Sequence, residues 1–526
     1  MGSRGRRRPP ETPKGDVSRY LPHAFALLAV VVALAHFRTQ IDSNDEGIAA
    51  MGAWRILRGE VPYRDFFAIE TPLSFYVVAP LYALFGVSFT VGRIVTQLLG
   101  IALVVSVFRL ARGFIPSPLF AAVPLAFLCQ AGVGIFPFAS HHWFADVFCL
   151  AAILAARRAL RRAETIGWWL AGAAGALAFL SLQDQGLFIL IGLGLVAALV
   201  PPAGSRGKSL TRFGGGALAA TFPLALWVLP RSGWGPAWHD LVWFPLTAYR
   251  ATPGNAYGFL QPFGEILTQW TSGAWRHAPV FVASATVTSL ALIATPIAAP
   301  LLILWTWRRL KGSTADCALL LLGAGAFLLT ALHRWAPINL QWAAAPPALA
   351  LAFWLHHAHE ASPTTVRRLT AVAAGVLLAA FGLFGMGRIA QAQNAGLWFD
   401  VDSPAGRTRV PGRAMGKQIQ EMITTVGERV PQGESLLVYG WPNWGFATLH
   451  PCPVRWDGFA PPDFPPGAYA HGAIAEVEEK KVAWIVTPVF DPPTEGHPDE
   501  WKSYLIGRYR LEWANPAWGL WKRSEG

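Results

Sequence analysis

The sequence predicts an all-α polytopic membrane domain of about eleven transmembrane helices, followed by a small α/β domain at the C-terminus. Of the 526 residues, 53% are hydrophobic and 14% are charged, whereas an ordinary soluble protein carries about 25% charged residues. The apolar residues form runs of roughly 17 to 22 positions almost free of charge, the length that a helix needs to cross a hydrocarbon layer. Beyond residue 387 the composition turns polar, so the soluble part is expected there.

The N-terminus begins with a basic segment, RGRRRPP at residues 4–10. The apolar run after it has no small-residue cleavage site, so we interpret it as an uncleaved signal anchor preceded by a cytoplasmic tail, residues 1–19. Many of the Lys and Arg residues behind the formal charge of +12 stand in short clusters beside the apolar runs, where they would set topology. We therefore expect a multi-pass protein of the inner (cytoplasmic) membrane and no nucleic-acid partner.

The membrane domain is expected over residues 20–386. One apolar stretch within it, residues 72–86, contains two prolines. Counting this stretch as a span would place RLAR (109–112) and RRALRR (157–162) outside, against the positive-inside rule, so we interpret it as an interfacial helix in the first outer loop, residues 37–91. The expected spans are residues 20–36, 92–110, 116–134, 142–156, 167–182, 186–200, 214–230, 279–305, 316–332, 338–355 and 368–386.

Eleven spans place the C-terminal domain, residues 387–526, on the extracytoplasmic side. Its strand-like runs SLLVYG (435–440) and VAWIVTPV (482–489) are separated by Pro- and Gly-rich loops and by the charged run AEVEEKK. This pattern is typical of a small α/β domain. The four cysteines show no paired spacing of metal-binding or redox type, so we expect them to be packing residues: Cys129, Cys149, Cys317 and Cys452.

Carboxylates are concentrated in the first outer loop. Only seven acids lie between residues 92 and 386, yet this loop alone carries six: Asp42, Asp45, Glu46, Glu60, Asp65 and Glu70. Asp45 and Glu46 closely follow the first span, near the lipid headgroups, where a charge is costly unless it has a function. The asymmetry predicts that the chemistry lies in this loop, with Tyr63, Arg64 and Asp65 as substrate contacts, although a merely solvated loop would have the same composition.

Two further groups of polar residues stand at the outer ends of spans. In FASHHWFAD, His141 and His142 precede Asp146, which could approach His142 on one helix face. This group suggests a proton or metal site or a phosphate contact, and a polar helix end at the interface is the alternative. Arg250, His333 and Arg334 also lie outside, against the usual charge bias, and could bind phosphate or simply keep their loops soluble.

Residues 44–93 resemble the first outer loop of the GT-C membrane glycosyltransferases, by pattern the bacterial protein-mannosyltransferase-like and aminoarabinose-transferase-like families. In these families the loop opens with Asp-Glu, passes a Gly-x-x-Pro-Tyr turn, reaches an acid before Lys-Pro-Pro-Leu or a variant, and ends near an Arg. The corresponding residues are Asp45 and Glu46, Gly59 to Tyr63, Glu70 before Thr71, Pro72 and Leu73, and Arg93. Thr71 replaces a lysine that contacts the lipid phosphate in many relatives, so another cation is expected there.

The resemblance implies an inverting glycosyltransferase that uses a polyprenyl-phosphate-linked sugar donor at the outer membrane face. Asp45 would be the base for the acceptor hydroxyl, and Glu46 and Glu70 would orient sugar or acceptor. Arg334, Arg250, His142 or a divalent metal ion would hold the phosphate. The acceptor could be a lipid, a protein or a polysaccharide of the cell envelope.

Two other classes of function fit parts of the sequence. A transporter or flippase of a lipid-linked glycan would show inverted repeats and ionisable residues at mid-membrane, whereas the acids here lie at span ends and no repeat is evident. A non-catalytic envelope assembly module would tolerate the loss of Asp45.

Overall fold

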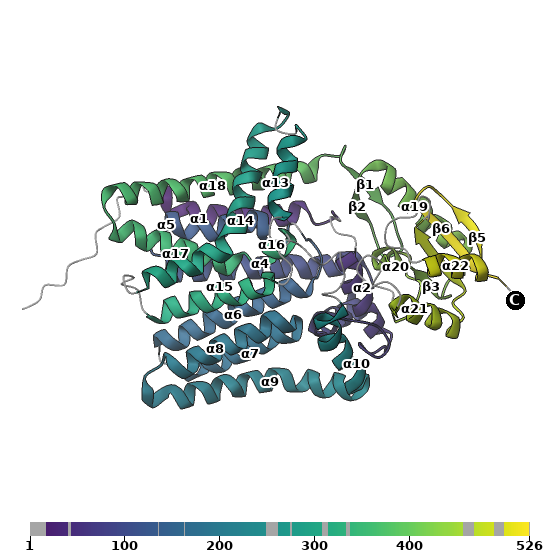
Figure 1. Ribbon diagram of the computed structural model, residues 1–526, viewed down its shortest axis with the longest axis horizontal. Coiled ribbons are helices and arrows are strands. Elements are labelled where there is room, and N and C mark those ends of the chain that lie inside the picture. The colour runs from purple at the N-terminus through teal and green to yellow at the C-terminus, as the bar shows by residue number, and fades with distance from the viewer. Residues whose placement is uncertain are drawn as a thin grey trace, which may run out of the picture.

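The structure is a computed structural model that describes residues 17–39, 44–134, 136–162, 164–248, 261–273, 276–307, 314–332, 337–455, 468–488 and 499–524. A bundle of long helices occupies most of the molecule, and the C-terminal domain lies at one end of it (Figure 1). The chain is a multi-pass membrane protein, because five helices are long and apolar enough to cross a membrane and several shorter apolar helices pack beside them.

Each of the eleven expected spans coincides with a helix. They are α1 (Leu21–Ala35), α4 (Phe89–Phe114), α5 (Pro118–Ala131), α6 (His141–Arg162), α7 (Thr165–Ser181), α8 (Gln183–Leu199), α9 (Arg206–Ser232), α14 (Pro279–Thr306), α15 (Thr314–Leu332), α17 (Ala345–Ala361) and α18 (Thr364–Gln393). Two short 3₁₀ turns, η1 (Val17–Tyr20) and η2 (Ala203–Ser205), precede α1 and α9.

The expected span over residues 338–355 is wrong at its start. A short helix, α16 (Pro337–Trp342), ends first, and α17 begins only at Ala345. Pro346 and Pro347 stand in the first turn of α17, the position of a helix that best accommodates proline, because proline has no backbone N–H.

The segment between α1 and α4, which we call the first loop, contains two helices, α2 (Asn44–Leu57) and α3 (Leu73–Phe85). α3 has 13 residues and an internal proline, Pro80. The interpretation of residues 72–86 as a non-spanning helix stays a prediction. The long connection between α9 and α14 also contains short helices: α10 (Trp234–Trp238), the π-helical turn η3 (His239–Trp243), α11 (Phe244–Leu246) and α13 (Gln261–Thr271).

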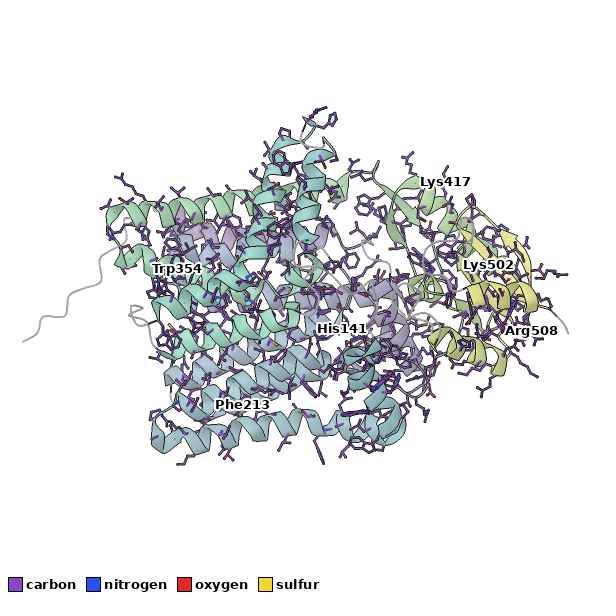
Figure 2. All side chains as sticks on the ribbon, in the orientation of Figure 1. His141, Phe213, Trp354, Lys417, Lys502 and Arg508 are labelled. Atoms are coloured by element: carbon purple, nitrogen blue, oxygen red, sulfur yellow. The ribbon has the colours of Figure 1, made fainter. Side chains whose placement is uncertain are left out.

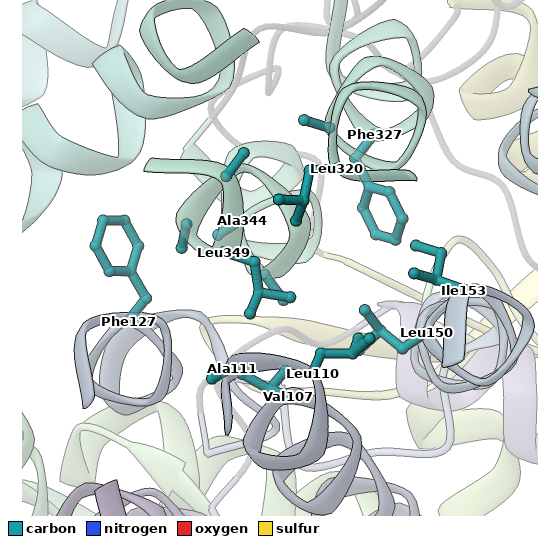
Figure 3. Packing of buried hydrophobic residues seen from close by; sticks show 14 of the residues in the cluster. Val107, Leu110, Ala111, Phe127, Leu150, Ile153, Leu320, Phe327, Ala344 and Leu349 are labelled. Carbon is teal, nitrogen blue, oxygen red and sulfur yellow. The ribbon is translucent and has the colours of Figure 1, made fainter. Parts of the chain in front are cut away.

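The bundle core is closely packed and apolar. Side chains of α4, α5, α6, α15 and α17 interdigitate, among them Val107, Leu110, Phe127, Leu150, Ile153, Leu320, Phe327 and Leu349 (Figure 3). Glycines let α7 and α9 touch backbone to backbone, because a Cβ on Gly172 would lie 1.9 Å from the Phe213 carbonyl oxygen and one on Gly216 would lie 2.0 Å from that of Trp169. Such small-residue crossings are common between membrane helices, where van der Waals packing drives association.

In its described residues, the C-terminal domain contains two small sheets and four helices. β1 (Trp398–Val401) and β2 (Thr408–Pro411) form an antiparallel pair, and the second sheet has the order β3 (Leu436–Val438), β4 (Trp484–Pro488), β6 (Trp518–Arg523), β5 (Tyr509–Ala514). β3 and β4 are parallel, and both fall in the expected strand runs, which confirms the α/β interpretation. The helices are α19 (Arg413–Arg429), α20 (Pro442–Thr448), α21 (Ala468–Glu479) and α22 (Asp499–Arg508). The four cysteines are buried and form no disulfide.

The two ends of the bundle differ in charge. α18 runs along the bundle and continues into β1, so its last residue lies at the end that carries the C-terminal domain (Figure 1); we call this the domain end. Its first turn, with Arg367 and Arg368, lies at the opposite end together with Arg112 of α4 and Arg161 of α6. The candidate site residues of the first loop and of the start of α6 all lie at the domain end.

Candidate functional site at the domain end

Asp45 and Glu46 stand in the first turn of α2, where the helix dipole favours a negative charge. Glu46 is 5% exposed, and its two carboxylate oxygens accept hydrogen bonds from Arg93 of α4 at 2.7 and 2.9 Å. Arg93 also donates to the Thr408 hydroxyl of β2 at 2.7 Å. Glu46 and Arg93 therefore connect the first loop, a membrane helix and the C-terminal domain.

The C-terminal domain packs directly on this turn of α2. A Cβ on Gly47 would lie 2.1 Å from the backbone nitrogen of Asn443 in α20, so only glycine permits this approach. Asp45 is half-buried beside this contact. Asp42, the first acid of the loop, lies outside the described residues.

Glu70 lies at the domain end in a second group, with two histidines. Its carboxylate Oε1 is 3.7 Å from the His141 Nε2, while its buried Oε2 has no hydrogen-bond partner among the described residues. Burial raises the pKa of Glu70 to about 7, because a low dielectric disfavours the charged form. Figure 2 shows His141 at the end of the bundle that faces the C-terminal domain, whose surface carries Lys417 and Lys502.

A stack of rings continues from His141 across the site. The His141 and His142 ring centroids are 4.4 Å apart, and the His142 ring lies 3.7 Å from the Trp342 ring of α16 at an angle of 15°. Trp342 also contacts Phe136, whose carbonyl accepts a hydrogen bond from the Trp143 indole. The structure thus brings Glu70, His141 and His142 together, and it adds Trp342, which was not expected from the sequence.

Thr71, the residue at the position of the family lysine, has a structural role. Its hydroxyl donates to the Phe179 carbonyl at 2.7 Å, and its backbone N–H donates to Gln183 Oε1 at 3.3 Å. The Gln183 amide in turn donates to the Ile69 carbonyl at 2.6 Å. These bonds hold the segment before α3 on the turn between α7 and α8, so the hydroxyl of Thr71 is already engaged.

Tyr63, Arg64 and Asp65, expected as substrate contacts, lie in the turn before Glu70. Tyr63 is 1% exposed with φ 69°, and its hydroxyl donates to the Glu70 carbonyl at 3.0 Å. Asp65 accepts from the Val61 N–H at 2.8 Å and pairs with Arg64 at 2.7 Å. These contacts leave Tyr63 buried and use Asp65 to hold the turn that carries Glu70, and the substrate contacts of these residues stay a prediction.

Asp146 is buried in α6 and accepts a hydrogen bond from the Gln185 amide of α8 at 2.7 Å. In the described part of the chain, the Asp146 side chain thus bonds with Gln185 and not, as expected, with His142. Arg250, His333 and Arg334, the expected phosphate contacts, lie outside the described residues. Within the described ranges, no three His, Cys, Asp or Glu side chains gather closely enough to hold a metal ion.

An ion pair that the sequence analysis missed joins the C-terminal domain to two loops. Arg455 Nη2 is 2.7 Å from both carboxylate oxygens of Asp240 in η3, and Arg455 Nε donates to the Tyr63 carbonyl at 3.1 Å. Its own carbonyl accepts the Phe67 N–H at 3.0 Å. The scarcity of acids after residue 92 was the only sequence feature that could have drawn attention to Asp240. No feature of the neighbouring sequence indicated Arg455.

A second link crosses the same junction. Arg55 of α2 pairs with Glu60 at 2.6 Å and donates to the carbonyls of Val454 and Asp65 at 2.8 and 2.7 Å. The turn that carries Glu70 is therefore held between α2, η3 and the C-terminal domain.

Comparison with solved structures identifies the architecture. ArnT from Cupriavidus metallidurans bound to undecaprenyl phosphate superposes with a TM-score of 0.56 at 17% identity, over 95% of this chain and 97% of ArnT. This chain has the GT-C fold. Two larger GT-C proteins also match: the oligosaccharyltransferase AglB from Archaeoglobus fulgidus, solved with an inhibitory peptide and a dolichol-phosphate (TM-score 0.50, 15% identity, 96% of this chain and 74% of AglB), and the arabinofuranosyltransferase AftD from Mycobacteria (0.51, 15%, 97% and 40%).

A comparison of sequence alone matches a smaller part of the chain. Residues 70–228 match the family of dolichyl-phosphate-mannose-protein mannosyltransferases. No curated protein matches the chain in sequence. The matched segment begins at Glu70 and includes His141, His142 and Asp146, so part of the candidate site lies in the portion that matches this family.

Proposed function

We propose that this chain is a membrane glycosyltransferase that moves a sugar from a polyprenyl-phosphate carrier to an acceptor hydroxyl at the extracytoplasmic face. The observations that carry the proposal are the placement of Asp45 in the first turn of α2 and of Glu70 beside His141, both at the domain end of a GT-C fold. The support from relatives is that ArnT and AglB were solved with undecaprenyl phosphate and dolichol-phosphate. Outside the cytoplasm nucleotide sugars are not supplied, whereas a lipid carrier presents its sugar at the membrane surface.

The proposed reaction is a single displacement at the anomeric carbon. The acceptor O–H gives its proton to the Asp45 carboxylate, the acceptor oxygen bonds to the sugar carbon, and the bond from that carbon to the phosphate oxygen breaks. The lipid phosphate leaves with both bonding electrons, so a cation near it stabilises the transition state. Because the acceptor oxygen displaces the phosphate in one step, the configuration of the sugar carbon inverts.

The other acids would have supporting parts. Glu46, held at both oxygens by Arg93, would fix the first turn of α2 and so the direction of Asp45. Glu70, with a pKa of about 7, can be neutral near physiological pH and donate a hydrogen bond to a sugar or acceptor oxygen.

The function is tested by mass spectrometry of envelope glycans from cells with the gene, without it, and with the gene encoding Asp45→Asn. We expect one glycan to lose the mass of one sugar in the last two strains. Unchanged glycans in all three strains would refute the proposal. Accumulation of a lipid-linked sugar on the cytoplasmic side would instead favour a flippase.

The side of the membrane is tested separately with alkaline phosphatase, which is active only outside the cytoplasm. A fusion after residue 526 should be active and a fusion at residue 113 inactive, because the basic helix ends favour the cytoplasm. Opposite results at both positions would reverse the proposed orientation.

A further inference from the structure

Arg388 stands near the domain end of α18 with its charge largely uncompensated. The guanidinium donates to Gln391 Oε1 in its own helix at 2.8 Å, and its contact with the Gly134 carbonyl is long, at 3.4 Å. The Nε atom is buried and has no partner among the described residues. Arg388 therefore has donor capacity that the protein does not use.

Other arginines that are buried or half-buried in the described part of the chain have a carboxylate within 4.0 Å. They are Arg55 with Glu60, Arg93 with Glu46, Arg157 with Asp316, Arg409 with Asp400, Arg455 with Asp240 and Arg523 with Glu478. Arg388 is the exception among these residues. An unpaired charge removed from water is destabilising unless another charge complements it.

The neighbour that shares this environment is His36, the residue after α1. It is 0% exposed, its Nδ1 lies 2.9 Å from the Val32 carbonyl oxygen, and its Nε2 is buried without a partner. A Cβ on Gly134, whose carbonyl Arg388 contacts, would lie 3.0 Å from the Val32 carbonyl oxygen that faces His36. Because Nδ1 donates to that carbonyl, the Nε2 of the neutral ring carries an unused lone pair.

Arg388 is connected to the candidate site through a series of neighbouring contacts. Its contact Gly134 is two residues from Phe136, which packs on Trp342 at 5.0 Å. Trp342 stacks on His142, and His141 beside it faces Glu70. The Thr71 hydroxyl already donates to the Phe179 carbonyl, whereas the Arg388 guanidinium still has a donor available for an anion.

We propose that Arg388, together with His36, binds the phosphate group of the polyprenyl lipid. The guanidinium would donate to charged phosphate oxygens, and the neutral Nε2 of His36 would accept from a P–OH. A phosphate monoester has a second pKa of about 6 and so retains a proton part of the time, whereas the phosphodiester of the sugar donor has none to give. The pair thus suits the released polyprenyl phosphate better than the donor, which deepens the proposed function.

The test measures binding of undecaprenyl phosphate to the purified full-length protein, by the shift of its thermal unfolding temperature, without any sugar. Arg388→Gln should weaken the apparent Kd roughly 10- to 100-fold, as expected for lost hydrogen bonds to a charged group. Without lipid, this variant should unfold at the same or a higher temperature than wild type, because an unpaired charge has been removed. Arg231→Gln is the matched control, because it changes an exposed arginine in the last turn of α9. This variant should bind undecaprenyl phosphate as wild type does.

Several results would overturn the proposal. One is binding by Arg388→Gln within threefold of wild type; another is a lower unfolding temperature without lipid together with an unchanged lipid shift, which would make Arg388 a structural residue. Inorganic phosphate producing the same Arg388-dependent shift would show that the site takes a free anion instead of a lipid. If Arg388→Gln does not fold, Arg388→Lys decides, since it keeps the charge but loses the planar fork and should bind measurably more weakly.

This experiment is independent of the proposed function. If the wild-type protein binds undecaprenyl phosphate through Arg388 but transfers no sugar, the lipid site is supported and the proposed enzymatic function is refuted. If the wild-type protein transfers sugar and Arg388→Gln binds the lipid as wild type does, the proposed enzymatic function is supported and the Arg388 site is refuted.

Discussion

Replacement of Arg455 by glutamine should release the C-terminal domain from the turn that carries Glu70. Asp240 is 0% exposed and Arg455 has an exposed side-chain fraction of 18%, so the substitution leaves a buried carboxylate without its cation. Breaking one partner of a buried pair costs about 3 to 5 kcal/mol. We expect the low end, about 3 kcal/mol, because the His239 ring at 2.9 Å and the Ala68 N–H still face Asp240.

The assay is hydrogen exchange of the intact protein, followed on peptides that cover residues 61–68 and 234–246. A loss of about 3 kcal/mol corresponds to roughly 100-fold more frequent local opening, hence to about 100-fold faster exchange at these amides. The double variant Arg455→Gln with Asp240→Asn should recover much of the protection, since it leaves no unpaired charge.

A surface ion pair of the same domain provides the control. Arg409 and Asp400 pair at 3.0 Å with exposed side-chain fractions of 36% and 44%, and exposed pairs contribute about 0 to 1 kcal/mol. Arg409→Gln should therefore change exchange little. If Arg455→Gln accelerates exchange no more than Arg409→Gln does, the pair is not holding the junction and the reasoning fails.

Three further predictions concern the site. Asp45→Asn should lower sugar transfer by about 100- to 10,000-fold with an unchanged unfolding temperature, because Asn has nearly the same shape but takes no proton; transfer within threefold of wild type would exclude Asp45 as the base. Glu70 has its folded pKa raised from 4.5 to about 7, so between these values the folded state binds more protons than the unfolded one and stability should fall as pH rises, then level off above about 7. An unfolding temperature measured across this range should lose that slope in Glu70→Gln, and an identical slope would contradict the assignment. Gly47→Ala should lower the unfolding temperature and the transfer rate, because its Cβ would lie 2.1 Å from the Asn443 nitrogen; Gly207→Ala, with nothing within 4 Å of the added Cβ, is the control and should be neutral.

Local sequence was sufficient wherever one segment alone satisfied its physical constraint. An apolar run must form a helix in lipid because each backbone N–H needs a partner within the segment, and so helices occur at all eleven expected spans. β3 and β4 were recognised as short apolar runs between turn signals. β5 and β6 were missed, although Tyr509, Leu511 and Trp513 of β5 alternate with polar residues. The start of α17 was misplaced because two prolines at its N-terminus were counted within an apolar run.

The sequence by itself determined the membrane character, most of the helix positions, the concentration of acids in the first loop and the resemblance of that loop to GT-C proteins. Only the tertiary structure decided which of those acids hold the protein together. Glu46 meets Arg93 across 47 positions and Arg455 meets Asp240 across 215, and such partners are chosen by the packing of whole helices and domains. For the same reason the turn residues Tyr63 and Asp65 could not be distinguished from Glu70 by type or spacing, because burial and hydrogen bonding, which separate a structural residue from one available to a substrate, depend on what the rest of the chain places around it.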